Sequence, residues 1–96
     1  MTEKQFETKI RKFLEGEGCY YFKVWGGGMQ KAGIPDLIVC CNGYFVAVEV
    51  KSAKGQPSAL QLHTLNEIAK AGGKTWILYP KDFEFFKQLI YRLKGR

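Results

Sequence analysis

The sequence predicts an α/β fold in which a central mixed sheet is flanked by helices, with the element order αβββαβα. Apolar residues recur at helical spacing near both ends of the chain and once more in its second half. A two-residue Asn42-Gly43 turn joins two segments of β character. A helix then connects this hairpin to a last strand, which predicts a right-handed crossover and therefore a sheet of mixed direction.

The first half of the chain opens with a helix over residues 2–16. Thr2 and Gln5 form a capping box at its start, glycines end it, and its apolar face is made by Phe6, Ile10, Phe13 and Leu14. A strand is expected over residues 19–25. A glycine-rich loop follows and runs to Pro35.

The second half begins with the hairpin, whose strands are expected over residues 37–41 and 44–51. Ser58 and Gln61 form a second capping box, for a helix that runs to about Ala71 and is closed by two glycines. A strand over residues 75–79 is stopped by a proline. Asp82 is expected to cap a last helix, whose apolar stripe consists of Phe83, Phe86, Leu89, Ile90 and Leu93.

Composition narrows the class of protein. At 96 residues and 46% hydrophobic, the chain is expected to form one domain over residues 1–96. Its net charge of +6 favours a polyanion partner such as DNA. A basic surface that contacts only solvent would give the same net charge. No apolar stretch approaches the roughly 20 residues that span a bilayer, so we expect no membrane partner and a cytoplasmic location. The cysteines lack zinc-site spacing and are expected to be reduced, buried residues: Cys19, Cys40 and Cys41.

The hairpin is predicted to place two carboxylates opposite each other. With Asn42-Gly43 as a two-residue loop, the pairing of the flanking strands brings Asp36 to face Glu49. Lys51 lies two residues beyond Glu49 and shares its face of the strand. Directly opposed side chains have Cβ atoms about 4.5–5.5 Å apart, so the two acids and the lysine should converge.

Two acids at facing positions of an apolar hairpin need a neutralising partner, because opposed like charges destabilise a sheet. A divalent cation would serve, and hard carboxylate ligands suit Mg²⁺ or Mn²⁺, with the Val50 carbonyl and a substrate phosphate as further ligands. The alternative is an ordinary surface ion pair between Lys51 and one of the acids. An Asp after Pro35 that faces a Glu, with a Lys two residues on, favours the metal site.

The segments Gly33-Ile34-Pro35-Asp36 and Glu49-Val50-Lys51 resemble the G-x-P-D and E-x-K motifs of the PD-(D/E)XK nuclease superfamily. More narrowly, they resemble the VRR-NUC family. The resemblance covers nearly the whole chain and implies a restriction-endonuclease-like core. The family's Glu of the first helix and Gln of the helix after E-x-K fall on Glu7 and Gln61.

The resemblance implies a DNA endonuclease that depends on Mg²⁺ or Mn²⁺. Asp36 and Glu49 would bind the metal with the Val50 carbonyl, helped by Glu7. Lys51 would orient the attacking water or stabilise the phosphate, and Gln61 would orient this machinery. Short members of the family resemble phage-type proteins, located in the host cytoplasm, that act on branched DNA such as Holliday junctions as homodimers.

Other functions stay open on the sequence. A catalytically degenerate DNA-binding module would need only the fold and the basic balance, and intact Asp36, Glu49 and Lys51 disfavour it. The substrate could also be a DNA flap, plain duplex DNA or another phosphoester. Glu7 lies in register with the apolar face of its helix but could pair with Arg11, and Gln61 could serve the capping box alone.

Contacts to DNA and to a second copy are also expected. Three lysines are predicted to line the phosphate path near the metal: Lys23, Lys31 and Lys54. Aromatic residues within 20–22 and 83–86 are assigned to the core or to a subunit interface. A domain this small exposes much apolar surface, and symmetric cutting of two strands needs two sites, so a two-fold homodimer is expected.

Overall fold

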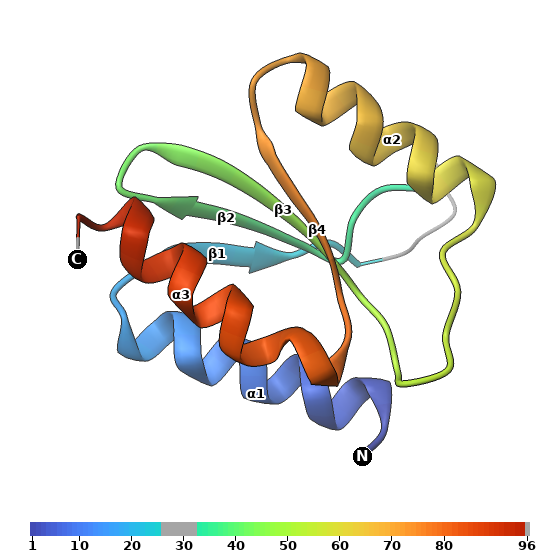
Figure 1. The fold of residues 1–96 in the computed structure, drawn as a ribbon, viewed down its shortest axis with the longest axis horizontal. Coiled ribbons are helices and arrows are strands. Elements are labelled where there is room, and N and C mark those ends of the chain that lie inside the picture. Colours follow the sequence, from blue (N-terminus) through green and yellow to red (C-terminus); the bar gives the residue numbers. More distant parts are fainter. Residues whose placement is uncertain (26–32, 96) are drawn as a thin grey trace.

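A computed structural model describes residues 1–25 and 33–95 of the chain. The elements follow the predicted order: α1 (Glu3–Gly16), β1 (Tyr20–Lys23), β2 (Leu37–Cys41), β3 (Tyr44–Val50), α2 (Ala59–Lys70), β4 (Lys74–Leu78), a 3₁₀ turn η1 (Pro80–Asp82) and α3 (Phe83–Leu93). Figure 1 shows these elements as a sheet with helices packed against it. Among the described residues, no helix combines the length and apolar character needed to cross a bilayer.

The four strands lie in the order β1-β2-β3-β4. The first two pairings are antiparallel, and β3 pairs with β4 in parallel, which requires the crossover that α2 makes. The fold class predicted from the sequence is therefore confirmed: a mixed sheet flanked by helices, in the order of a restriction-endonuclease-like core.

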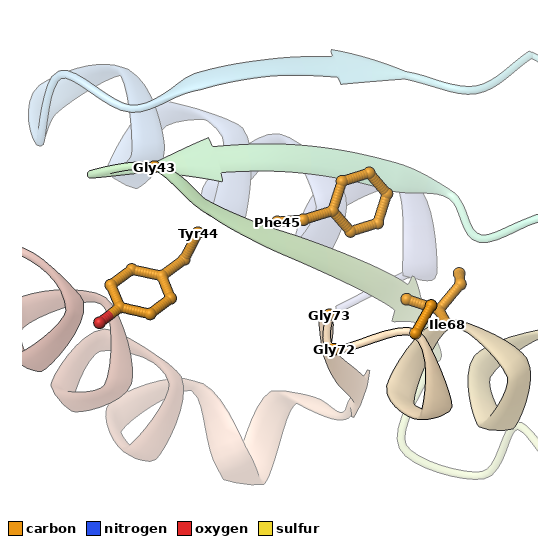
Figure 2. A pocket seen from close by; sticks show the side chains of 7 residues that line it. Gly43, Tyr44, Phe45, Ile68, Gly72 and Gly73 are labelled. Atoms are coloured by element: carbon orange, nitrogen blue, oxygen red, sulfur yellow. The ribbon is translucent and has the colours of Figure 1, made fainter.

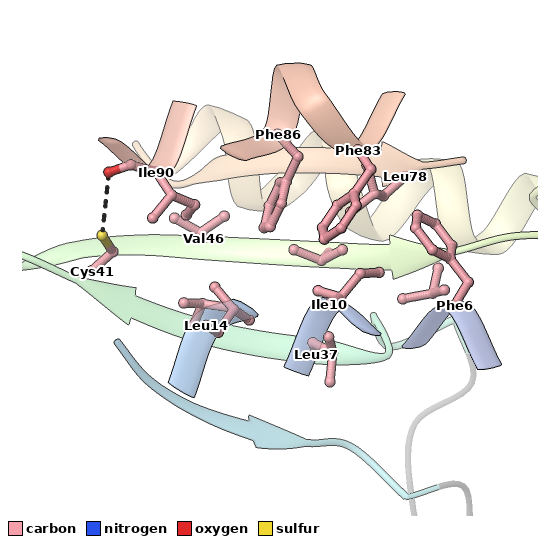
Figure 3. Packing of buried hydrophobic residues seen from close by; sticks show 13 residues of the cluster. Phe6, Ile10, Leu14, Leu37, Cys41, Val46, Leu78, Phe83, Phe86 and Ile90 are labelled. Atoms are coloured by element: carbon pink, nitrogen blue, oxygen red, sulfur yellow. Dashed lines mark hydrogen bonds between the residues drawn. The ribbon is translucent and has the colours of Figure 1, made fainter. Parts of the chain in front are cut away.

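The hydrophobic core lies between one face of the sheet and the helices α1 and α3 (Figure 3). Alternate residues of β2 and β3 point into it, because successive side chains of a strand point to opposite faces. Its fully buried members include Phe6, Ile10, Leu14, Leu37, Val39, Val46, Val48, Leu78, Phe86 and Ile90. The intervening residues of β3, Glu49 among them, therefore belong to the opposite face, the one against which α2 packs.

The tight turn between β2 and β3 has the backbone that its sequence predicts. Asn42 and Gly43 have φ angles of 51° and 85°, as a type I′ hairpin turn requires. The side-chain amide of Asn42 donates a hydrogen bond to the carbonyl of Leu93, 2.8 Å away. The turn that sets the strand register is thus attached to the end of α3.

Several predicted details were wrong. Strand β1 is shorter than residues 19–25, because the Cys19 amide is used by the end of α1, where it donates to the Leu14 carbonyl. Asp82 occupies the N-cap position of α3 without a side-chain cap bond, since the chain enters that helix from the 3₁₀ turn. Cys40 is exposed, because alternation along β2 turns it away from the core that holds Cys41.

Candidate active site

The hairpin register is the one expected from the turn. Leu37 pairs with Val48, and the pairing runs without a break to Cys41 and Tyr44 beside the turn. One position beyond the Leu37 pair, Asp36 stands opposite Glu49. These two acids lie where β2 begins and β3 ends, which is also the end of the sheet at which β1 and β4 terminate.

Asp36 is fixed by both its backbone and its side chain. Its carbonyl accepts a hydrogen bond from the Val24 amide at 2.8 Å, and its Oδ2 accepts one from the Val50 amide, also at 2.8 Å. A carboxylate that accepts a backbone N–H has a defined position. The hairpin backbone itself therefore aims the Asp36 side chain.

Gly33 brings the segment that leads to Asp36 against the first turn of α2. Its φ is +82°, and a Cβ built there would lie 2.8 Å from Leu60 Cγ and 2.9 Å from the Leu60 carbonyl oxygen. Only glycine fits this approach, both in backbone angle and in space. The structure thus explains why the G-x-P-D motif has a glycine here, which the positions of the motif residues in the sequence do not explain.

Glu49 is the most deeply buried acidic residue described, with 2% of its surface exposed. Its Oε2 accepts a hydrogen bond from Gln61 Nε2 at 2.9 Å and lies 3.3 Å from the ammonium of Lys51. Its other oxygen, Oε1, is buried and has no hydrogen-bond partner among the described residues. An unsatisfied buried carboxylate oxygen is costly, and it marks the point where a ligand can bind.

Gln61 completes the capping box of α2 and also contacts Glu49. Its Oε1 accepts a hydrogen bond from the Ser58 amide at 2.8 Å, while the Ser58 hydroxyl accepts one from the Gln61 amide, so the capping box is complete. Because the cap uses the amide oxygen, the amide nitrogen is the end that faces Glu49. The helix cap thereby fixes a donor toward the carboxylate.

Burial, and after it the charge of the facing Asp36, raise the pKa of Glu49 to about 7, against the lowering effect of Lys51. At neutral pH the charged form of Glu49 is therefore disfavoured unless a compensating positive charge lies nearby. The lysine supplies only part of that compensation.

A divalent cation fits these residues. Mg²⁺ in phosphate-handling sites uses one or two carboxylates and takes its remaining ligands from water and substrate. Asp36 and the unpartnered oxygen of Glu49 provide such a pair. Within residues 1–25 and 33–95, no group of three or more His, Cys, Asp or Glu side chains is arranged to hold a metal ion.

Glu7 does not join the acid pair in this structure. It is buried, as its register on α1 predicts, but its Oε1 pairs with the ammonium of Lys23 at 2.5 Å. The expectation that Glu7 helps the metal site therefore stays a prediction, which would require Glu7 to exchange this partner. The pairing with Arg11 considered from the sequence is not the one formed either, since Arg11 contacts Tyr21.

The three lysines expected along the DNA path have different surroundings. Lys23 is engaged with Glu7, and Lys54 is exposed in the turn between β3 and α2. Lys31 lies outside the described residues. One residue that the sequence interpretation did not single out is Trp25, which is exposed at the end of β1 beside Lys23.

Comparison with known proteins identifies one family model that matches this chain. The model of the family described as archaeal Holliday junction resolvase (hjc) matches residues 2–90, which include the acid pair, Lys51 and Gln61. No curated protein and no solved structure gives a significant match. The matched family is of the PD-(D/E)XK nuclease type, so the wider resemblance seen in the motifs is confirmed. The narrower resemblance to VRR-NUC proteins of phage type is not confirmed by this match.

Replacing Gln61 with Glu should separate the two roles of this residue. A Glu keeps the capping box but places a carboxylate oxygen against Glu49 Oε2, so we expect a loss of roughly 1–3 kcal/mol in the free energy of unfolding at pH 8 without metal. Gln5→Glu is the matched control, because Gln5 holds the same position in the capping box of α1. Urea denaturation of both variants measures this, and equal stabilities would contradict the contact with Glu49.

The raised pKa of Glu49 predicts how the metal-free protein responds to pH. Protonation of folded Glu49 stabilises the protein, and this contribution is lost as the pH rises through about 7. We expect the free energy of unfolding to fall by about 2 kcal/mol more in the wild type than in Glu49→Gln between pH 5 and pH 8. Denaturation in EDTA at both pH values is the measurement, and parallel pH profiles would show that Glu49 titrates normally.

Proposed function

Because the chain belongs to the archaeal Holliday junction resolvase family, we propose that it is a divalent-metal-dependent endonuclease that hydrolyses phosphodiester bonds in branched DNA. The observation that carries the proposal is the buried Glu49 opposite Asp36, with Lys51 and Gln61 on the same carboxylate. A structural role alone does not explain two acids placed together in an apolar hairpin.

Asp36, Glu49 and the carbonyl of Val50 would hold the metal, which we propose to be Mg²⁺ or Mn²⁺. Such an ion, when bound, acidifies water and withdraws charge from the scissile phosphate. The Val50 amide already orients the Asp36 carboxylate, and Gln61 orients that of Glu49. The protein's contribution is thus to present two carboxylate oxygens in one fixed arrangement.

Lys51 is proposed to act on the phosphate. Its side chain is 13% exposed, so its ammonium is partly desolvated beside Glu49. A positive charge in such a site interacts more strongly with an anion than it would in water. Lys51 can therefore stabilise the additional negative charge that develops on the phosphate as a water molecule attacks.

DNA binding fits the net charge of +6, and Lys23, Lys31 and Lys54 are proposed as phosphate contacts near the acid pair. Glu7 is also proposed to help the metal site, for which it would have to exchange its partner Lys23. A catalytically degenerate DNA-binding module is the second candidate. The complete set of Asp36, Glu49 and Lys51 gives no support to it.

We also propose that the protein acts as a homodimer. Three aromatic side chains on the sheet face that carries Glu49 are about half exposed or more: Tyr20, Phe22 and Phe45. Phe45 lines a hollow of about 470 Å³ together with Ile68 of α2 and with Gly73, which lies beyond the end of that helix. Figure 2 shows these residues from close by. Contiguous exposed apolar surface of this kind is typical of a protein interface.

The nuclease proposal is tested with Asp36→Asn and Lys51→Met on a four-way DNA junction in Mg²⁺ or Mn²⁺. Each change removes a charge from the proposed site, so we expect cleavage to fall by about 100-fold or more. Binding of the junction in EDTA should change by only a few-fold. Rates of strand scission and gel-shift affinities are the measurements.

Lys70→Met is the matched control for Lys51→Met, because Lys70 forms an exposed ion pair with Glu67 at the far end of α2. It should cut the junction at nearly the wild-type rate. Cleavage that survives unchanged in Asp36→Asn or Lys51→Met would contradict the proposed chemistry. Failure of the wild type to cut any branched DNA while still binding it would favour the degenerate module.

The dimer is tested by sedimentation velocity at micromolar concentration. Phe22→Glu combined with Phe45→Glu should convert the wild-type dimer to a monomer, because two charges would be buried in its interface. Phe85→Glu is the control, since Phe85 is also exposed but belongs to α3 on the opposite side of the sheet. A monomeric wild type would contradict the dimer proposal.

A further inference from the structure

Trp25 is an aromatic residue that the fold leaves largely exposed. It follows the end of β1, and 68% of its surface is exposed. The other tryptophan, Trp76, packs edge-on against Phe86 at the border of the core. Exposure of a single ring is common on protein surfaces, so the inference depends on what lies around Trp25.

The position of Trp25 relates it to the acid pair. The preceding residue, Val24, donates its amide to the carbonyl of Asp36 at 2.8 Å. Trp25 is thus one residue away from a backbone contact with a proposed metal ligand. It stands at the same end of the sheet as Glu49 and Lys51.

Trp25 also lines a hollow of about 330 Å³ between the end of β1 and the first half of α1. Basic side chains from both elements share this hollow: Lys4, Arg11 and Lys23. One of its acids, Glu7, is already paired with Lys23. With Glu3 as the second acid, the basic side chains still outnumber the acidic ones. An aromatic surface and a small excess of positive charge therefore lie together, which suits a ligand that carries both a flat ring and a phosphate.

Lys23 also orients the ring. Its ammonium lies 5.1 Å from the centroid of the Trp25 ring, a cation–π arrangement. Because Lys23 is held at the same time by Glu7, the indole is supported on one side by a fixed group. The large exposed fraction leaves the rest of the ring open to a stacking partner.

We propose that Trp25 stacks on a base whose face is uncovered at the branch point of a DNA junction, while Lys4 and Arg11 contact the adjacent phosphates. This inference rests on the proposed function and names the feature of the substrate that is recognised. The bases inside a continuous duplex are stacked on both faces, so they offer no surface to an indole ring. Trp25 would therefore favour branched DNA over duplex DNA.

The test uses the full-length chain in EDTA, so that DNA binds without being cut. In Trp76→Phe, Trp25 is the only tryptophan, and its fluorescence should be quenched at least twofold by a four-way junction and much less by a duplex with the same arm sequences. Trp25→Ala should raise the dissociation constant for the junction by about 5- to 100-fold. Its affinity for the duplex should change by less than about twofold.

Two further variants serve as controls. Trp25→Phe keeps an aromatic ring and should recover most of the junction affinity, whereas Phe85→Ala removes an equally exposed ring from α3 and should leave it unchanged. Equal junction affinity of Trp25→Ala and wild type, or equal quenching by junction and duplex, would overturn the inference alone. A wild type that binds neither DNA would overturn the proposed function together with it.

Discussion

The structure of the site depends on one constraint, which is that two carboxylates face each other across a hairpin. The turn at Asn42-Gly43 sets the register, and the register decides that Asp36 meets Glu49 and not an apolar neighbour. Everything close to this pair moderates its repulsion: the Val50 amide, the Gln61 amide and the Lys51 ammonium. Within residues 1–25 and 33–95, these groups leave the buried Oε1 of Glu49 without a hydrogen-bond partner, so the acid pair still lacks positive charge.

The two faces of the sheet have different roles: one forms the hydrophobic core, and the other carries Glu49. Helices α1 and α3 bury one face in a continuous apolar core. Alternation along β3 then carries Glu49 to the other face, where α2 supplies Gln61. The parallel crossover to β4 is what brings α2 to that place. The site thus follows from strand periodicity and from the parallel connection between β3 and β4.

The sequence predicted most of this fold, because each main element carries a local signal. Two complete capping boxes and an Asn-Gly turn have short-range mechanisms, and the alignment of Asp36 with Glu49 follows directly from the turn. What it could not predict depends on contacts between distant segments. The choice of Lys23 as partner of Glu7 requires the packing of α1 on β1, and the need for glycine at position 33 requires the approach of Leu60.

The double use of Gln61 has a consequence for how this active site is maintained. The side-chain amide closes the first turn of α2 with its oxygen and contacts Glu49 with its nitrogen, so fraying of that helix end and disorganisation of the carboxylate are one event. The exposed Ser58 thereby helps to fix the position of Glu49, because its hydroxyl holds Gln61 in the capping box. Loss of the Ser58 hydroxyl would consequently disturb the position of Glu49 as well as the start of the helix.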